Sequence, residues 1–309
     1  MDFRTFIEPQ QGTSYEAVLA LARASQQAGM SGFFTSDHYL RMGGVDGLPG
    51  PLDAWTTLAG LARDTDTIRL GTLVTPTTFR GPGSFAIQAA QVDQMSGGRV
   101  EIGLGAGWYE AEHAATGAEF PSVEDRFDRL EDTAAILTGL WATPVGELFS
   151  YSGAHFEIVD SPALPKPAQV PGPPIIIGGK GKTRTPRLAA TVGAEFNLPF
   201  SSVEDWSRVV ENVKQSCTQH GRDPSDLVYS AAQTVCIGRD EPEFVTRAEK
   251  IGRDPAELRE NAVAGLPNEA VARLERFGAA GCQRVYLQCL DIDDLDHMDL
   301  IATEIIGAI

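Results

Sequence analysis

Residues 100–110 read Val-Glu-Ile-Gly-Leu-Gly-Ala-Gly-Trp-Tyr-Glu, a short apolar run over Val100–Gly105 that leads into a glycine-rich turn. Short runs that are apolar or β-branched and end in Gly, Pro or a polar residue are typical of β-strands. The same pattern recurs on both sides of this stretch. The further strand-like runs are Asp2–Glu8, Gly32–Asp37, Ile68–Thr75, Pro174–Gly178, Ala194–Pro199, Val228–Ile237 and Arg284–Leu290. Together they predict eight strands.

The segments between these strands have the apolar spacing of amphipathic helices. Thr13 and Glu16 have the spacing of a capping box at the start of the first helix, and Gly29 provides its stop. Ser202 is a good N-cap for a later helix. The last helix is expected over about residues 293–306. Strands that alternate with helices in this way predict an α/β fold with a parallel sheet.

Eight strand–helix units close most economically into a (β/α)8 TIM barrel, and such barrels commonly use about 250 residues as one domain. A doubly wound open sheet is the alternative. We therefore expect residues 1–309 to form a single barrel domain. Tyr151–Val159 predicts a short hairpin insertion between strands four and five. The long connection Arg239–Pro267 before strand eight has room for an extra helix.

The chain is strongly acidic, with a formal net charge of −17. Such a surface repels nucleic-acid phosphates and anionic membranes, so neither is an expected partner. No apolar run approaches the ~20 residues that span a bilayer, and no signal-peptide pattern is visible, so a cytoplasmic location is expected. The cysteines form no CxxC pair, which favours reduced, buried thiols over a metal site. They are Cys217, Cys236, Cys282 and Cys289.

Polar residues follow strand two at its carboxyl end. A barrel of this kind places its active site at the carboxyl ends of the strands. Ser36, Asp37 and His38 are consecutive there. An Asp and a His at a strand end can act as an oriented acid–base pair. The structural alternative is an Asp that caps a turn and a His packed on the barrel rim.

Strand four is followed by alternating glycines and then by Glu112 and His113. Alternate glycines let a flat group approach the backbone closely. They do not make the dinucleotide-binding fingerprint, because the third glycine of that pattern is misplaced. The two polar residues are either site residues or solvated positions at a helix start.

The segment Gly178-Gly179-Lys180-Gly181-Lys182 follows strand five and leads into a helix. Backbone N–H groups at a helix start bind phosphate, and glycines allow close approach. The two lysines add positive charge to an otherwise acidic protein. The segment therefore predicts a phosphate-binding turn, with a solvated basic turn as the alternative.

Four motifs occur in order along the chain: Ser-Asp-His after strand two, Gly-Thr-Leu-Val-Thr-Pro-Thr at strand three, Gly-Leu-Gly-Ala-Gly-Trp-Tyr-Glu-Ala-Glu-His at strand four and Ile-Gly-Gly-Lys-Gly-Lys-Thr at strand five. Together they resemble the luciferase-like monooxygenase superfamily. The Ser-Asp-His signature resembles the branch that uses coenzyme F420, a deazaflavin. The resemblance covers nearly the whole chain, and the motifs are specific jointly rather than singly.

The resemblance implies that the cofactor ring lies across the barrel mouth, with His38 near its reactive centre. It also implies a bulge with a non-proline cis peptide between Leu73 and Val74. Gly71 can adopt backbone conformations that other residues avoid, and Pro76 restricts the backbone of Thr75 to an extended conformation. The cofactor-binding residues that follow from the resemblance are Asp37, His38, Leu73, Val74, Thr75, Gly105, Ala106, Gly107, Trp108, Gly178, Gly179, Lys180, Gly181 and Lys182.

The function implied by the resemblance is F420-dependent hydride transfer between the deazaflavin and a small organic substrate. An FMN-dependent luciferase-like monooxygenase, supplied with reduced flavin by a separate reductase, is the alternative. A non-catalytic flavin-binding barrel is a third hypothesis. Members of this group often pair through their outer helices, so a homodimer is one expectation for the assembly.

One position departs from the resemblance. In the deazaflavin-dependent glucose-6-phosphate dehydrogenase, a Glu follows the strand-four glycines directly, whereas Trp108 stands there in this chain. The departure argues against sugar-phosphate oxidation. Glu112 or His113 is expected to face the substrate pocket instead, beside His38 and Asp37 as the catalytic candidates.

Overall fold

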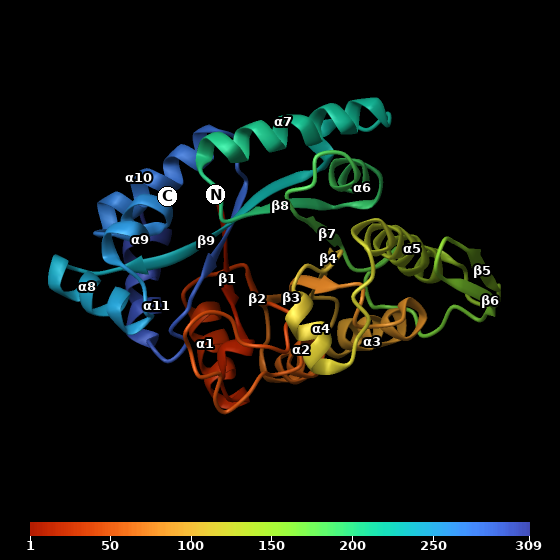
Figure 1. Cartoon of the computed structure of the whole chain (residues 1–309), viewed down its shortest axis with the longest axis horizontal. Coiled ribbons are helices and arrows are strands. Elements are labelled where there is room, and N and C mark those ends of the chain that lie inside the picture. The colour runs from red at the N-terminus through yellow and green to blue at the C-terminus, as the bar shows by residue number, and fades with distance from the viewer.

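Eight parallel strands form a closed ring in the computed structural model, which describes residues 1–309 (Figure 1). In barrel order they are β1 (Asp2–Ile7), β2 (Gly32–Thr35), β3 (Arg69–Pro76), β4 (Val100–Gly105), β7 (Ile175–Gly178), β8 (Glu195–Pro199), β9 (Val228–Ile237) and β11 (Arg284–Gln288). The ring closes because β9 pairs with β8 on one side and with β11 on the other. The predicted (β/α)8 barrel is confirmed, and the open-sheet alternative is wrong.

Helices connect the strands and surround the ring. They are α1 (Tyr15–Gln27), α2 (Ala54–Asp64), α3 (Pro82–Ser96), α4 (Glu110–Thr116), α5 (Val123–Ala142), α6 (Arg184–Val192), α7 (Val203–Gln219), α10 (Pro267–Ala279) and α11 (Leu295–Ile301). Two short 3-10 turns, η1 (Pro9–Gln11) and η2 (Pro224–Asp226), and a π-helical segment that follows α11, η3 (Ala302–Ile306), complete the helical elements. The Ser202 hydroxyl caps α7 as predicted. The cap of α1 is Ser14 rather than Thr13, because it is Ser14 that accepts from the backbone N–H of Ala17.

Two insertions extend from opposite ends of the molecule (Figure 1). The predicted hairpin consists of the antiparallel strands β5 (Phe149–Ser152) and β6 (Glu157–Ser161). It is anchored to α5 by the Asp132 carboxylate, which accepts hydrogen bonds from the Tyr151 hydroxyl and from the backbone of the hairpin turn. The second insertion holds two helices, α8 (Glu241–Lys250) and α9 (Pro255–Asn261), and a short strand β10 (Val263–Gly265) that pairs with β9.

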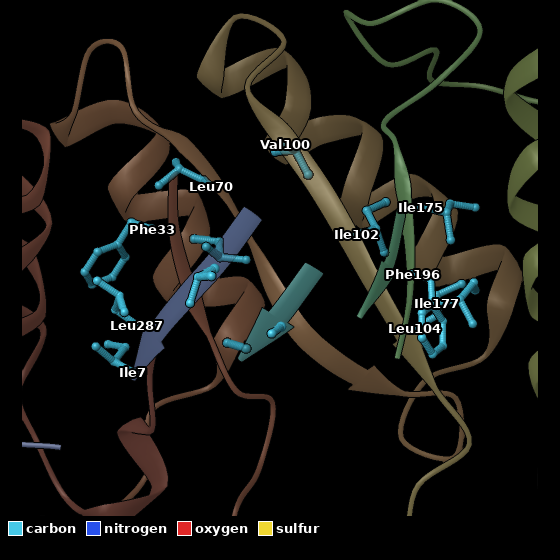
Figure 2. Packing of buried hydrophobic residues seen from close by; sticks show 14 of the residues in the cluster. Ile7, Phe33, Leu70, Val100, Ile102, Leu104, Ile175, Ile177, Phe196 and Leu287 are labelled. Carbon is cyan, nitrogen blue, oxygen red and sulfur yellow. The ribbon is translucent and has the colours of Figure 1, made fainter. Parts of the chain in front are cut away.

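The core has two layers because side chains alternate across each strand. Outward-facing side chains such as Phe33, Leu70 and Ile102 join one large buried cluster with the surrounding helices (Figure 2). The inward-facing apolar side chains form a separate small cluster inside the ring. Its members are Phe6, Phe34, Ile176, Ala232 and Tyr286. The barrel is therefore filled at mid-height, and ligands have access only above this layer.

Two expectations from composition concern the whole chain. The four cysteines are all buried free thiols, as predicted. None of the helices has both the length and the apolar character that a bilayer crossing requires.

Candidate active site

A cavity of about 340 Å³ opens at the carboxyl ends of the strands. The lining residues are Phe6, Glu8, Ser36, His38, Met42, Leu73, Val74, Pro76, Gly105, Ala106, Gly107, Trp108, Val123, Arg126, Phe127, Leu130, Gly178, Gly179, Lys180, Gly181, Thr185, Asn197, Pro199, Phe200 and Ala232. The loops after β2, β3, β4 and β7, which carry the sequence motifs, thus meet in one place. Asp37, Thr75, Lys182, Glu112 and His113 are the predicted site residues that do not line it.

The strand-three segment forms the predicted bulge. The peptide between Leu73 and Val74 is cis, and the pairing of β3 with β4 shifts register between Thr72 and Thr75. The Val74 side chain lies over β4, so that a Cβ on Gly105 would come 2.6 Å from it. The glycine at 105 therefore accommodates Val74 and also contributes to the cavity lining.

His38 is oriented by Glu112. The buried Glu112 carboxylate accepts from His38 Nδ1, at 2.8 and 3.0 Å to its two oxygens, and from the backbone N–H of Tyr39 at 3.1 Å. Because an ionised carboxylate only accepts, the hydrogen sits on Nδ1 and leaves Nε2 with a free lone pair. No protein group hydrogen-bonds to Nε2, and His38 lines the cavity. Glu112 thus acts on any ligand through His38 rather than by touching it.

Asp37 lies behind the cavity wall rather than in it. Its fully buried carboxylate accepts from the Thr75 hydroxyl at 2.8 Å and from Arg80, which also contacts the carboxylate of Asp53 and the hydroxyl of Tyr39. Burial raises the pKa of Asp37, against the lowering effect of Arg80 and Thr75. The network ties the loop after β2 to the start of α2 and the end of β3. Asp37 and Thr75 therefore hold the backbone beside His38.

His113 is enclosed in protein. Its Nδ1 bonds to the carbonyl of Tyr109 at 2.8 Å, and its Nε2 to the Thr78 hydroxyl at 2.7 Å. Its ring packs between Phe79 and Phe120. Because both nitrogens are occupied and the side chain is buried, His113 packs the loop after β4 and has no path to a substrate.

The predicted phosphate turn forms one end of the cavity. Residues 178–181 line it, and Gly179 adopts φ +138°, a conformation that favours glycine. Both lysines are exposed, but only Lys180 belongs to the lining. Arg184, at the start of α6, is held by Asp128 and Glu131. Of the basic residues in this segment, Lys180 is the one directed to the cavity and without an acidic partner.

Two charged lining residues were not expected from the sequence. Arg126, on α5, is 8% exposed, lies 3.9 Å above the Phe120 ring and forms no ion pair; its Nε has no hydrogen-bond partner. Phe127, the next residue, lies close to Gly181 of the phosphate turn. Glu8 follows β1 and also forms no ion pair. Neither residue belongs to a contiguous motif, so only the fold brings them to the site.

One group of potential metal ligands lies outside the cavity lining. Ligand atoms of Asp125, Asp128 and His155 come within 4.8 Å of one another. Arg184 already pairs with Asp128, however, so the cluster is partly neutralised by the protein itself.

Comparison with known proteins identifies the family to which the chain belongs. The family model for luciferase-like monooxygenases matches residues 1–284 of the chain. The chain therefore belongs to the luciferase-like monooxygenase family, an oxidoreductase class whose members use a deazaflavin or a flavin. Its fold and the position of its cavity are those that the resemblance of the sequence motifs implied.

The similar proteins include both F420-dependent and FMN-dependent enzymes. The chain is 26% identical to an F420-dependent glucose-6-phosphate dehydrogenase from Amycolatopsis mediterranei (strain U-32), over 83% of each chain. It is also 26% identical to an FMNH(2)-dependent dimethylsulfone monooxygenase from Pseudomonas putida, over 72% of this chain and 58% of the relative. Among solved structures, an F420-dependent secondary alcohol dehydrogenase in complex with an F420-acetone adduct superposes with a TM-score of 0.86 at 19% identity, over 100% of this chain and 99% of that one. This last match concerns the fold alone.

Proposed function

We propose that the protein is an F420-dependent oxidoreductase that transfers a hydride between the deazaflavin and a small organic substrate at the mouth of the barrel. The observation that carries the proposal is one cavity with two chemically different parts. The glycine turn with the unpaired Lys180 forms one part, and His38, which Glu112 orients from behind the lining, forms another.

The phosphate end of the cavity fits an anionic cofactor. Gly178, Gly179 and Gly181 expose backbone at the start of α6, and Lys180 brings a positive charge. The buried Nε of Arg126 has no partner within the protein. An orphaned donor on a buried guanidinium is costly, and an anionic oxygen would satisfy it. We assign these five residues to the phosphate.

The middle of the cavity fits a flat ring system. Leu73 and Val74 form one wall at the bulge, and Ala106, Gly107 and Trp108 form another. Apolar walls with few polar groups are typical of cofactor sites. When bound, F420 supplies a two-electron hydride donor or acceptor.

His38 supplies the proton-transfer group. Its free Nε2 can accept a proton from a substrate hydroxyl during oxidation, or return one to a carbonyl oxygen during reduction. The Glu112 carboxylate holds the ring in the required tautomer and stabilises the imidazolium form that results. Asp37, Thr75 and Arg80 keep the preceding backbone in place.

FMN-dependent monooxygenation is the second candidate, favoured by the similarity to the Pseudomonas putida enzyme. In that case a separate reductase would supply the reduced flavin. A homodimer formed through the outer helices is compatible with either function.

Side-by-side titration of the purified protein with F420 and with FMN, followed by fluorescence, tests the proposal. We expect tighter binding of F420, and reduction of bound F420 by an alcohol substrate without consumption of oxygen. Tight FMN binding without F420 binding would contradict the proposal and favour monooxygenation. Binding of F420 without turnover of any alcohol or ketone would instead favour a non-catalytic barrel.

A further inference from the structure

Glu8 is the one carboxylate in the lining of the cavity, and no residue neutralises it. It forms no ion pair with any Lys, Arg or His. Its hydrogen-bonding neighbour is the amide of Gln11, whose Nε2 donates to Glu8 Oε2 at 3.3 Å. The Gln11 amide oxygen in turn accepts from the backbone N–H of Met42 at 3.0 Å. Gln11 thereby links Glu8 to the loop that carries Met42, another lining residue.

The position of Glu8 follows from the alternation of side chains along β1. Arg4 and Phe6 point into the barrel, and Glu8 continues the same face two residues later, at the carboxyl end. The carboxylate therefore belongs to the uppermost layer of the barrel interior. It is only partly buried, so it faces the space in which a ligand sits.

The charges of the cavity are separated across the ring. Strand order places β1 directly opposite β7, with three strands between them on either side. Lys180 follows β7, and Arg126, the other cation of the lining, packs on Phe120 and donates to the carbonyl of Pro121. Glu8 follows β1, next to β2 and His38. Lys180 is thus at the phosphate end, and the Glu8 carboxylate is at the His38 side, where a substrate would react.

The other lining residues that follow β1 and β2 are Ser36, His38 and Met42, and Trp108 packs beside His38. No Lys or Arg is found among the lining residues from β1 and β2. An anionic substrate placed against His38 would meet Glu8 without a counter-charge. Like charges in a site with low-dielectric walls repel strongly, and such repulsion is a common source of specificity.

We infer that Glu8 is a specificity-determining residue which excludes anionic substrates, so that the site takes an uncharged alcohol or ketone with an apolar body. The inference rests on the proposed function. It separates this chain from the Amycolatopsis mediterranei relative, because glucose 6-phosphate carries a phosphate that would need a cation on the substrate side.

A matched pair of ligands tests the inference. Cyclohexanone and 4-oxocyclohexanecarboxylate share a ring and a ketone but differ by one negative charge. Binding of each to the F420-loaded protein is measured by ligand-observed NMR titration, and turnover is measured beside it. We expect the wild-type protein to bind cyclohexanone at least about tenfold more tightly than the carboxylate. Equal affinities, or no binding of cyclohexanone, would overturn the inference.

The Glu8→Gln variant removes the charge but keeps the shape. We expect it to bind 4-oxocyclohexanecarboxylate about tenfold more tightly than wild type and cyclohexanone within about twofold, because only the charged ligand is repelled. Glu110→Gln is the matched control, since Glu110 is exposed and outside the lining. An unchanged preference in Glu8→Gln would overturn the role of Glu8.

Titration with F420 alone separates this inference from the proposed function. Failure of the wild-type protein to bind F420 would contradict the proposed function. Retained F420 binding without discrimination between the two ketones would contradict only the inference about Glu8.

Discussion

At the amino-terminal end of the barrel, Arg4, Glu101 and Glu195 are buried, and each is paired with an opposite charge. At the carboxyl end, Glu8, Arg126 and Lys180 face a cavity without such partners. Both ends therefore place charge inside the ring, but only at the amino-terminal end does each of these side chains have an opposite charge beside it. The comparison teaches that a charged side chain that awaits a ligand is recognised by its missing counter-charge, not by its burial.

The amino-terminal end is a network of ion pairs, in which Arg4 Nε and one Glu195 oxygen have no hydrogen-bond partner. Arg4 and Arg69 both contact the Glu101 carboxylate, and Arg284 contacts Glu195 and Asp2. Arg4 also donates to the Tyr286 hydroxyl. These side chains fill the barrel floor below the apolar layer, where no ligand can reach. Their contribution is to stability and to the specification of one packing.

The largest effect on stability is expected from a substitution in this ion-pair network. Glu101→Gln leaves Arg4 and Arg69 without their shared counter-charge in a buried position. Removing one partner of a buried pair typically costs about 3–5 kcal/mol. We expect a loss of that size in the free energy of unfolding, measured by urea denaturation, with the remaining folded protein still binding F420.

Two comparisons sharpen this first prediction. Burial alone would raise the pKa of Glu101, but Arg4, Arg69 and Arg284 together outweigh it, so the pKa of Glu101 lies below its ordinary value of 4.5. The stability that Glu101 supplies is therefore present above about pH 4.5 and is lost as the pH falls further. The difference in the free energy of unfolding between wild type and Glu101→Gln should narrow at that lower pH.

Glu195→Gln should lower the free energy of unfolding less than Glu101→Gln, because burial raises the pKa of Glu195 and Arg284 keeps Asp2 as a partner. Equal losses in both variants would argue against a specific role for Glu101.

At the carboxyl end the largest effect is expected for His38. Loss of a general acid–base group typically lowers rates by 10²–10⁴-fold. His38→Ala should therefore reduce turnover of bound F420 with an alcohol by about two orders of magnitude or more. Its unfolding midpoint and its affinity for F420 should stay close to wild type. Full activity in this variant would reduce His38 to a residue that packs against Trp108.

Much of this architecture follows from local patterns in the sequence. The eight strands begin and end within a few residues of their predicted bounds, because apolar runs and the turns between them are short-range signals. The cap of α1 is displaced by one residue, since Thr13 and Ser14 have similar chemistry. The insertion before α10 holds two helices and the strand β10, whereas the sequence predicts one extra helix there. The apolar faces of these elements are short, so their sequence signals are weak.

The site is less accessible to sequence reasoning than the fold. Contiguous motifs lead to His38, Val74 and the phosphate turn, all of which line the cavity. The sequence does not show which way a side chain points after a strand ends, so Asp37 and His113 were grouped with the catalytic residues although both turn into the protein. Arg126 depends on where α5 meets the cavity, a tertiary feature. Glu8 did carry a signal, the alternation of Arg4, Phe6 and Glu8 along β1.

The third prediction concerns the cations at the phosphate end. A hydrogen bond to a charged group is worth about 1.5–3 kcal/mol, or roughly 10–100-fold in affinity. Lys180→Ala and Arg126→Ala should each weaken F420 binding by about that factor and reduce its salt dependence. Lys182→Ala is the matched control, because Lys182 lies outside the lining, and we expect less than about a twofold change. A larger effect at Lys182 than at Lys180 would place the phosphate farther along the turn.

The smallest effect is expected for Glu112, because it acts through His38. In Glu112→Gln the amide oxygen can still accept from Nδ1, but the NH2 group cannot accept from the Tyr39 backbone as the carboxylate does. Losing the charge should lower kcat by about tenfold and leave the KM for the alcohol nearly unchanged, since Glu112 is buried and does not line the cavity. ¹⁵N NMR of His38 provides a readout that a purely structural role would not move. Wild type should show the Nδ1–H tautomer, and the variant a mixture of both tautomers. An unaltered tautomer together with an unaltered kcat would show that the backbone fixes His38 without Glu112.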